Sequence, residues 1–350
     1  MSNEKSQELD RMQDELNEMM REIMSGKVRG KEKTKKLRKV DRMQRIISKR
    51  RSGEMFSRAF KKDLVSYSFI APNFIGFAVF TLVPIVFAFA LAFMKWDGSN
   101  EITWSGIENF KRMGSDIFFQ AALKNTIIYC IGTVPLTMIF SLGLAVVLNQ
   151  KVKGRGIFRT LSFFPYVGSL VAVTAVWKML FHPSKGPINA LLYYVFKVPQ
   201  DQLPQWFSGS LVLLSLILFS VWKYMGYYMV IYLAGLQNIS PDLYEAASLD
   251  GAGTWDRFKY ITWPQLRATT FFVVVMLTIN CFKIYDIAIM LAGGGSGELT
   301  TSATVLVYYI YQKAFIDWDL GYSSAVAMVL FLIVLVVTII QFAGEHIREQ

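Results

Sequence analysis

Six long runs of apolar residues follow residue 63, and polar loops separate them. Each run is long enough to cross about 30 Å of hydrocarbon as a helix of roughly 20 residues. None shows the apolar–polar alternation of a β-barrel strand, so helices must satisfy the backbone hydrogen bonds within the bilayer. The pattern predicts an all-α integral membrane fold with six transmembrane helices, near residues 67–94, 121–148, 157–181, 211–236, 268–292 and 322–343.

Composition agrees with this pattern, and the charge is concentrated at one end. Hydrophobic residues make up 53% of the chain and charged residues 18%, against roughly a quarter charged in a soluble chain. Residues 1–62 hold 19 Lys and Arg against 10 Asp and Glu, whereas the other 288 residues hold 18 and 16. We therefore expect two parts, a basic and partly helical cytoplasmic tail over 1–63 and a six-span domain over 64–345.

The distribution of Lys and Arg predicts the orientation in the membrane. The tail is strongly basic, and the loops after the second and fourth apolar runs are richer in Lys and Arg than the opposite loops. Cytoplasmic loops carry such an excess, so both termini are expected on the cytoplasmic side. The loop residues that carry the bias are Lys151, Lys153, Arg155, Arg159, Arg257, Lys259 and Arg267.

The tail contains two distinct patterns. A 3-4-3-4 apolar spacing, typical of the seam of a short amphipathic helix, joins Leu9, Met12, Leu16, Met19 and Ile23. A fraying helix without a partner is an equally supported interpretation. Residues 27–51 carry 13 Lys and Arg against Glu32 and Asp41, and such a run indicates contact with anionic membrane lipid. Because no aromatic residue is interleaved with these cations, no nucleic-acid partner is expected.

The stretch between the fourth and fifth runs, residues 238–267, predicts two short helices joined by a glycine turn. Ser240 is a good N-cap and Pro241 fits the first helical position, so a helix is expected from Pro241 to about Leu249. Gly251 can adopt the left-handed conformation that ends it. Thr254 can cap a second helix, which is expected to end before Pro264.

The first of these helices has a small, lightly charged face. Ala246 and Ala247 let another surface approach closely, and Glu245 supplies one charge for a basic partner. Such a helix fits a groove in a second protein. An ordinary loop helix that packs on its own spans explains the same residues equally well.

The pattern Glu245-Ala246-Ala247, Gly251 and Ile261-Thr262-Trp263-Pro264 resembles the EAA loop of permease subunits in binding-protein-dependent type I ABC importers. Further stretches are similar to the carbohydrate-uptake branch of that family, the maltose-permease-like subunits. They include Trp222–Gly226, Phe282–Asp286, Gly293–Gly297, Tyr309–Tyr311 and Gly321–Ala325. The sequence departs from the family pattern at Trp263, where leucine is usual, and at Ser296, where proline is usual.

This resemblance implies an assembly and a function. The chain would form half of the translocation pathway of an ATP-driven sugar importer, for an oligosaccharide, in a bacterial or archaeal cell membrane. Its partners would be a second homologous permease, two cytoplasmic ABC ATPase subunits and an extracytoplasmic sugar-binding protein. ATP and Mg would be bound by the ATPase, and no cofactor by this chain, which has no G-x-x-x-x-G-K-[ST] motif. The ATPase-coupling residues would be Glu245, Ala246, Ala247, Asp250, Gly251 and Pro264.

Polar residues in the fourth and fifth runs indicate where a substrate could pass, because polar groups are costly at mid-bilayer. If the two spans face each other, they would line a wet cavity with amide, carboxylate, ammonium and aromatic groups, which suits a sugar. Two simpler interpretations stay open. Lys283 and Asp286 can neutralise each other along one helix, and Lys223 can pair with a partner subunit. The candidate pathway residues are Ser220, Lys223, Tyr224, Tyr227, Asn280, Lys283 and Asp286.

No catalytic or metal site is expected. The two histidines lie far apart in sequence, and each of the two cysteines lies inside an apolar run, so neither a metal cluster nor a disulfide framework is indicated. No catalytic triad or paired carboxylate is visible, so the chain is expected to be a non-catalytic subunit.

Two alternative functions are an ion-gradient-driven secondary transporter and a membrane-anchored scaffold that acts through its basic tail.

Overall fold

The computed structural model describes residues 2–26, 30–150, 153–293 and 300–349. Lys151, Ser296 and most of the Gly293–Gly297 stretch therefore lie outside the described residues. The chain divides into two compact units, Met1–Ile85 and Val86–Gln350, and each is considered by itself.

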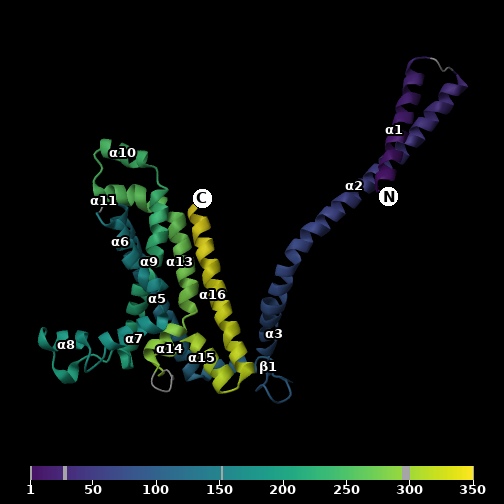
Figure 1. Cartoon of the computed structure of the whole chain (residues 1–350). Coiled ribbons are helices and arrows are strands. Elements are labelled where there is room, and N and C mark those ends of the chain that lie inside the picture. Colours follow the sequence, from purple (N-terminus) through teal and green to yellow (C-terminus); the bar gives the residue numbers. More distant parts are fainter. Residues whose placement is uncertain (1, 27–29, 151–152, 294–299, 350) are drawn as a thin grey trace. The chain divides into compact units, whose positions relative to one another are not determined.

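The first unit begins with an antiparallel pair of helices, α1 (Ser2–Met24) and the first part of α2 (Lys31–Phe77) (Figure 1). The apolar seam of α1 packs against α2. Leu9 and Leu16 are buried with Ile47, while Met19 and Ile23 are buried with Val40. Two ion pairs flank this seam, Lys36 with Glu22 at 2.6 Å and Lys39 with Glu15 at 3.2 Å. The fraying-helix interpretation is therefore set aside.

Beyond the hairpin, α2 continues into the first apolar run. A π-helical turn, η1 (Ala78–Leu82), and α3 (Val83–Leu91) follow it directly. The π turn comes just before Pro84, whose ring cannot donate a hydrogen bond and would clash with the carbonyl one turn earlier in a regular α-helix. The helical stretch Val65–Leu91 is long and apolar enough to cross a membrane.

In the second unit, α3 is followed by a short antiparallel ribbon, β1 (Met94–Lys95) and β2 (Thr103–Trp104), in which Met94 pairs with Trp104. The helices of its first half are α4 (Glu108–Ser115), α5 (Ile117–Asn149), α6 (Arg155–Val167), α7 (Leu170–Leu180), α8 (Pro187–Tyr194), η2 (Gln200–Gln202), η3 (Gly209–Leu211) and α9 (Val212–Gln237).

The second half of this unit is also helical. Its elements are α10 (Pro241–Leu249), α11 (Thr254–Arg257), η4 (Phe258–Thr262), α12 (Trp263–Gln265), α13 (Arg267–Phe282), α14 (Asp286–Ala292), α15 (Leu306–Tyr311), η5 (Gln312–Ile316) and α16 (Leu320–Glu349). Figure 1 shows α10 and α11 at the end of the bundle where the C-terminus lies, with α8, α14 and α15 at the opposite end.

The core of the second unit lies around α9, which packs against α5, α6 and α13. Leu216 and Phe219 of α9 are fully buried, and Tyr129 of α5 is buried beside them. Gly226 of α9 lies so close to α6 that an added Cβ would fall 1.8 Å from the Ser162 carbonyl oxygen. Glycine is therefore required for this close approach of the two backbones.

Four described helices are long and apolar enough to cross a membrane, Val65–Leu91, Ile117–Asn149, Gly209–Gln237 and Leu320–Glu345. Two bent pairs raise the number to six if each pair is one span. They are Arg155–Val167 with Leu170–Leu180, bent by 99°, and Thr254–Gln265 with Arg267–Phe282, bent by 66°. The all-α membrane fold is confirmed, whereas the count of six spans stays a prediction.

Two of the expected spans differ from the structure in detail. The run at 157–181 is divided because Gly168 and Ser169 adopt extended ψ angles of 147° and 125°. The run at 268–292 is interrupted because α13 ends at Phe282 and Tyr285 leaves the helical region, with a φ of −143°. Apolar residues continue on both sides of the first interruption, so apolar periodicity does not reveal it, whereas the second interruption falls between the charged residues Lys283 and Asp286.

Candidate functional site

Helix α10 projects from the end of the bundle with little contact to the rest of the chain. The Ser240 hydroxyl accepts a hydrogen bond from the Asp242 amide, which caps the first turn as expected. Gly251 has a φ of +79°, the left-handed conformation predicted for the helix end. Glu245 and Ala246 are exposed, and the Glu245 carboxylate has no hydrogen-bonding or ionic partner among the described residues.

Two side-chain contacts hold α10 in place. The Tyr244 hydroxyl and the Thr262 hydroxyl lie 3.0 Å apart, and Arg257 donates to the Ser248 hydroxyl at 3.1 Å. Away from these contacts the helix is open, since Leu249 is 90% exposed and Leu243 is also exposed. This arrangement favours the groove-docking interpretation over a loop helix packed on its own spans.

The second helix of the loop differs from the prediction at both ends. Gly253, not Thr254, is the N-cap residue, and its amide donates to the Asp256 carboxylate at 3.3 Å. The helical path does not end before Pro264 but continues through it to Gln265. A π-helical turn, η4, immediately precedes α12 and opens the backbone enough to accommodate the proline ring.

Two of the candidate pathway residues are buried and satisfied within this chain. Ser220 is fully buried and its hydroxyl accepts a hydrogen bond from Tyr129 at 2.7 Å. The Lys223 ammonium donates to the carbonyl oxygens of Pro165 at 3.0 Å and Tyr166 at 3.4 Å. The pairing of Lys223 with its own chain explains its burial without a residue from another subunit.

The Lys223 contact lies where α6 ends and the chain turns into α7. Helix-terminal carbonyls have no amide one turn ahead, and the negative end of the helix dipole attracts a cation. Lys223 therefore satisfies the carbonyl groups exposed by the bend. Tyr227 stacks on Tyr166 at a ring-centroid distance of 4.4 Å, and Tyr224 lies 6.3 Å from the same ring. One face of α9 thus holds the C-terminal end of α6.

The remaining pathway residues lie on or near the break that follows α13. Asn280 is exposed, and its amide donates to the Tyr228 hydroxyl at 3.2 Å. Lys283 and Asp286 are also exposed, and no ion pair joins them in the described part of the chain. The break places Ile284 in the core while leaving these two charges at the surface. The fifth run is therefore not one continuous helix, and Lys283 and Asp286 do not neutralise each other along one helix, although all three groups stay accessible.

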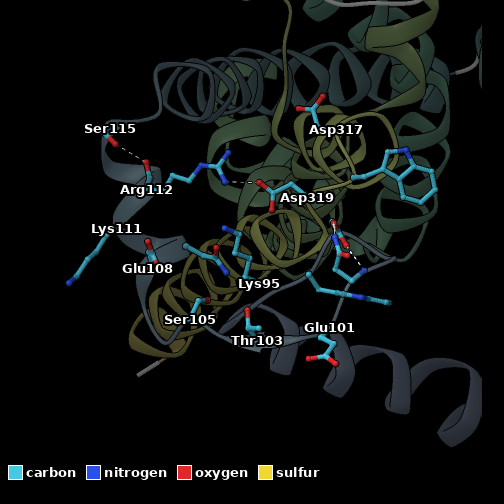
Figure 2. Close-up of a pocket in the computed structure, with 15 residues that line it drawn as sticks. Lys95, Glu101, Thr103, Ser105, Glu108, Lys111, Arg112, Ser115, Asp317 and Asp319 are labelled. Atoms are coloured by element: carbon cyan, nitrogen blue, oxygen red, sulfur yellow. Dashed lines mark hydrogen bonds and ion pairs between the residues drawn. The ribbon is translucent and has the colours of Figure 1, made fainter.

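A polar cavity of about 900 Å³ lies at the end of the second unit opposite α10. We call it the distal cavity; Figure 2 shows its lining, which includes Lys95, Asp97, Glu101, Arg112, Trp318 and Asp319. Arg112 donates to Asp319 at 2.6 Å and lies over the Tyr322 ring at 4.2 Å. The Ser99 and Asn100 amides donate to Asp97. None of the seven pathway residues lines this cavity.

Asp116 ties the start of α5 to α15 and α16 beside the distal cavity. Its carboxylate accepts hydrogen bonds from the Phe118 and Phe119 amides and from the hydroxyls of Tyr309 and Tyr322. Burial raises the pKa of this carboxyl, but the four donors together outweigh burial and hold the pKa below its ordinary value. Asp116 therefore stays ionised and fixes this end of the bundle.

A protein-family model, described as "Binding-protein-dependent transport system inner membrane component", matches residues 137–346, from α5 through α10 and α13 into α16. The chain belongs to this family. The permease is 41% identical over 293 residues to the "Probable ABC transporter permease protein YesP" of Bacillus subtilis (strain 168), which covers 82% of this chain and 92% of that protein. The resemblance to permease subunits of binding-protein-dependent ABC importers is confirmed.

Other relatives have names that state a substrate. The "Lactose transport system permease protein LacF" of Rhizobium radiobacter is 32% identical over 290 residues, covering 82% of this permease and 96% of that protein. Among solved structures, a chain of a bacterial ABC transporter involved in the import of the acidic polysaccharide alginate matches with a TM-score of 0.72 at 22% identity. That match covers 83% of the permease and 97% of the other chain, and it shows the shared fold.

Several residues around these sites were not found from the sequence. Tyr166, Tyr129 and the Pro165 carbonyl complete the surroundings of α9, and Asp116 organises the end near the distal cavity. Their partners on other helices are 57 or more positions away in the sequence, and no local pattern marks these long-range contacts. One signal was available, since Gly226 stands inside an otherwise bulky stretch, and an isolated glycine in a helix suggests a close backbone approach.

Proposed function

We propose that this permease is one of two transmembrane subunits of an ATP-driven importer for a sugar, most consistent with an oligosaccharide. The proposal is supported by relatives described as permeases for lactose, for arabinooligosaccharides and for trehalose and maltose, at 30–32% identity. Family membership argues against the ion-gradient-driven transporter and the tail-driven scaffold. The ATP would be bound and hydrolysed with Mg by partner subunits.

The single observation that carries the coupling part of this proposal is the exposure of α10. A docked helix needs a small face and an unpaired polar group, which Ala246 and Glu245 supply. We infer that α10 seats in a cleft of a cytoplasmic ABC ATPase, with Ala247, Asp250, Gly251 and Pro264 shaping the loop around it. Closure of two ATPases would then move the loop, and the spans would follow as rigid elements.

The orientation follows from this docking. The end that carries α10 and the C-terminus would face the cytoplasm, as would the basic tail, in agreement with the excess of Lys and Arg. The distal cavity would then open on the outer side, where an extracytoplasmic sugar-binding protein would deliver its ligand. One structural relative is described as an alginate transporter in complex with an alginate pentasaccharide-bound periplasmic protein.

For the substrate pathway we propose a division of roles. Asn280, Lys283 and Asp286 are exposed polar groups at the break after α13 and would face the pathway between this chain and a second permease. Tyr224 and Tyr227, with Tyr166, would offer aromatic rings beside it. Ser220 and Lys223 would not contact the substrate but would hold α5 and α6 in position against α9.

A bulky substitution on α10 tests the coupling proposal. Ala246→Trp should prevent docking, so that ATPase no longer co-purifies with the permease and sugar uptake is lost, while the protein still inserts in the membrane. Ala190→Trp is a matched control, because Ala190 is also an exposed alanine on a short helix, α8, at the opposite end of the bundle. Normal uptake and ATPase recovery by Ala246→Trp would refute the coupling role.

A further inference from the structure

Six cations form a row along the first part of α2. They follow a 4-3-4-3-4 spacing, which keeps side chains on one face of a helix, and every one of them is exposed. The row covers 18 residue steps, or about 27 Å at the rise of an α-helix. We call it the cationic stripe, and its members are Lys31, Lys35, Arg38, Arg42, Arg45 and Lys49.

The pairing of α1 with α2 determines where the stripe faces. Val40 and Ile47 of α2 are buried in the seam with α1. Arg38 and Arg45 each precede one of these residues by two positions, which is about 200° of rotation around the helix. The stripe therefore lies on the side of the hairpin turned away from α1, and the seam is not available to another helix.

The two helices of the hairpin carry opposite charge. Residues 2–24 hold seven Asp and Glu against three Lys and Arg, whereas residues 31–49 hold nine Lys and Arg against two Asp and Glu. The ion pairs across the seam use Lys36 and Lys39, which are not part of the stripe. Within the stripe, Arg45 pairs with Asp41 at 3.3 Å. The hairpin therefore has an acidic helix, α1, and a basic helix, the first part of α2.

We propose that the cationic stripe binds the anionic headgroup surface of the membrane that holds this chain, with α1 turned to solvent. The first candidate span begins at Val65, 16 residues after Lys49 on the same continuous helix, so the stripe is tethered close to lipid. The pair Ser52 and Gly53 lies between them, and such pairs are where long helices bend. Single-stranded RNA is disfavoured because residues 27–51 offer no aromatic ring for base stacking.

A fluorescence experiment on the full chain in nanodiscs tests this proposal. A fluorophore on Thr34→Cys reports the stripe side, because residue 34 is three positions after Lys31 and four before Arg38. A fluorophore on Gln7→Cys reports the opposite side, because residue 7 is two positions before the buried Leu9. Cys130 and Cys281 are buried, and the unsubstituted chain serves as the labelling blank. The lipids carry a nitroxide quencher on the headgroup.

In nanodiscs with about one-third phosphatidylglycerol, we expect quenching at position 34 but not at position 7. The quenching should be absent in pure phosphatidylcholine and should disappear in about 1 M salt, where the Debye length is about 3 Å. Each cation near an anionic surface favours binding by about fivefold, so the triple variant Lys35→Gln, Arg38→Gln, Arg42→Gln should lower the ratio of docked to free hairpin about 100-fold.

The control variant removes the same net charge from positions outside the stripe, with Arg11→Gln, Arg21→Gln and Lys33→Gln, and should keep the quenching. Hydrogen exchange over residues 9–23 verifies that the hairpin stays folded in both variants. Equal quenching in neutral and anionic lipid, or equal loss in the two triple variants, would overturn the proposal. If the fluorophore at position 34 is not quenched in anionic lipid, the proposal is also overturned, and an acidic protein becomes the candidate binding partner of the stripe.

Discussion

The Lys223 ammonium nitrogen lies 3.0 Å from the Pro165 carbonyl oxygen, at the point where α6 ends and the chain bends by 99° into α7. A buried cation thus completes the backbone of a neighbouring helix. In a low-dielectric environment an unpaired carbonyl is costly, so this contact stabilises a bend that the apolar sequence alone would not produce. Lys223 therefore positions the bend behind the proposed pathway.

Replacing Lys223 should destabilise the fold. Lys223→Met keeps the length of the side chain but leaves the carbonyls of Pro165 and Tyr166 without their donor, so we expect a loss of about 2 kcal/mol in the free energy of unfolding. Thermal unfolding of the purified permease in detergent measures this effect. Lys283→Met is the control and should leave the melting temperature unchanged, because Lys283 is exposed. Equal melting temperatures for both variants would contradict the positioning role.

Gly226→Ala should be strongly destabilising. The added methyl group would meet the Ser162 carbonyl oxygen at 1.8 Å, and because this contact is with backbone, α6 and α9 must separate. We expect a cost of about 3 kcal/mol, seen as a lower yield of folded protein and a lower melting temperature. Gly143→Ala in α5 is the matched control, since an added Cβ there meets nothing within 4 Å. That variant should be neutral or stabilising by up to about 1 kcal/mol.

The exposed charges after α13 should affect transport rather than folding. If Asp286 contacts sugar hydroxyls, Asp286→Asn should reduce the initial rate of uptake about tenfold, the cost of one weakened charged hydrogen bond. Uptake of radiolabelled sugar by proteoliposomes that contain the whole importer measures this rate. Lys185→Gln, an exposed charge change on the loop before α8, should leave the rate unchanged. A wild-type rate for Asp286→Asn would remove Asp286 from the pathway.

The loop at Asp97 should open only in strong acid. Hydrogen bonds from the Asn100 and Ser99 amides lower the pKa of the Asp97 carboxyl from 3.8 to about 2. The pKa of the Asp97 carboxyl is lower in the folded loop than in the unfolded chain. The ionised carboxylate therefore stabilises the loop fully above pH 3.8, and this stabilisation is lost as the pH falls through about 2. Hydrogen exchange over residues 96–102, corrected for intrinsic rates, should show protection from neutral pH to about 4 and release below it. Asp97→Asn should weaken the protection at every pH, and an unchanged profile would show that the carboxylate does not hold the loop.

Several features could be predicted because their causes are local. The apolar runs indicated the membrane fold, and the caps at Ser240 and Gly251 gave the bounds of α10. The 3-4-3-4 spacing identified the buried side of α1. In each case the signal lies within one or two helical turns, so sequence periodicity and capping chemistry are sufficient.

The arrangement of the polar interior could not be predicted. Ser220 and Lys223 were predicted to line the substrate pathway because polar groups are costly at mid-bilayer. In the structure they instead form hydrogen bonds with Tyr129 and Pro165, which lie on other helices. Lys283 and Asp286 stand at the break after Phe282, but their three-residue spacing also fits one continuous helix, so the spacing did not distinguish a break from a helix. Which polar groups face each other depends on helix packing, and no local pattern records it.

By itself the sequence determined that this chain is helical, apolar and membrane-embedded, with a capped helix in the loop at residues 238–267 and an apolar seam along a short helix in the tail, because these properties depend on residues close together along the chain. Only the tertiary structure decided that Lys223 serves a backbone bend, that Gly226 admits α6, and that Asp286 stays exposed. Those outcomes depend on contacts between distant helices, where shape and unsatisfied hydrogen bonds select the partner.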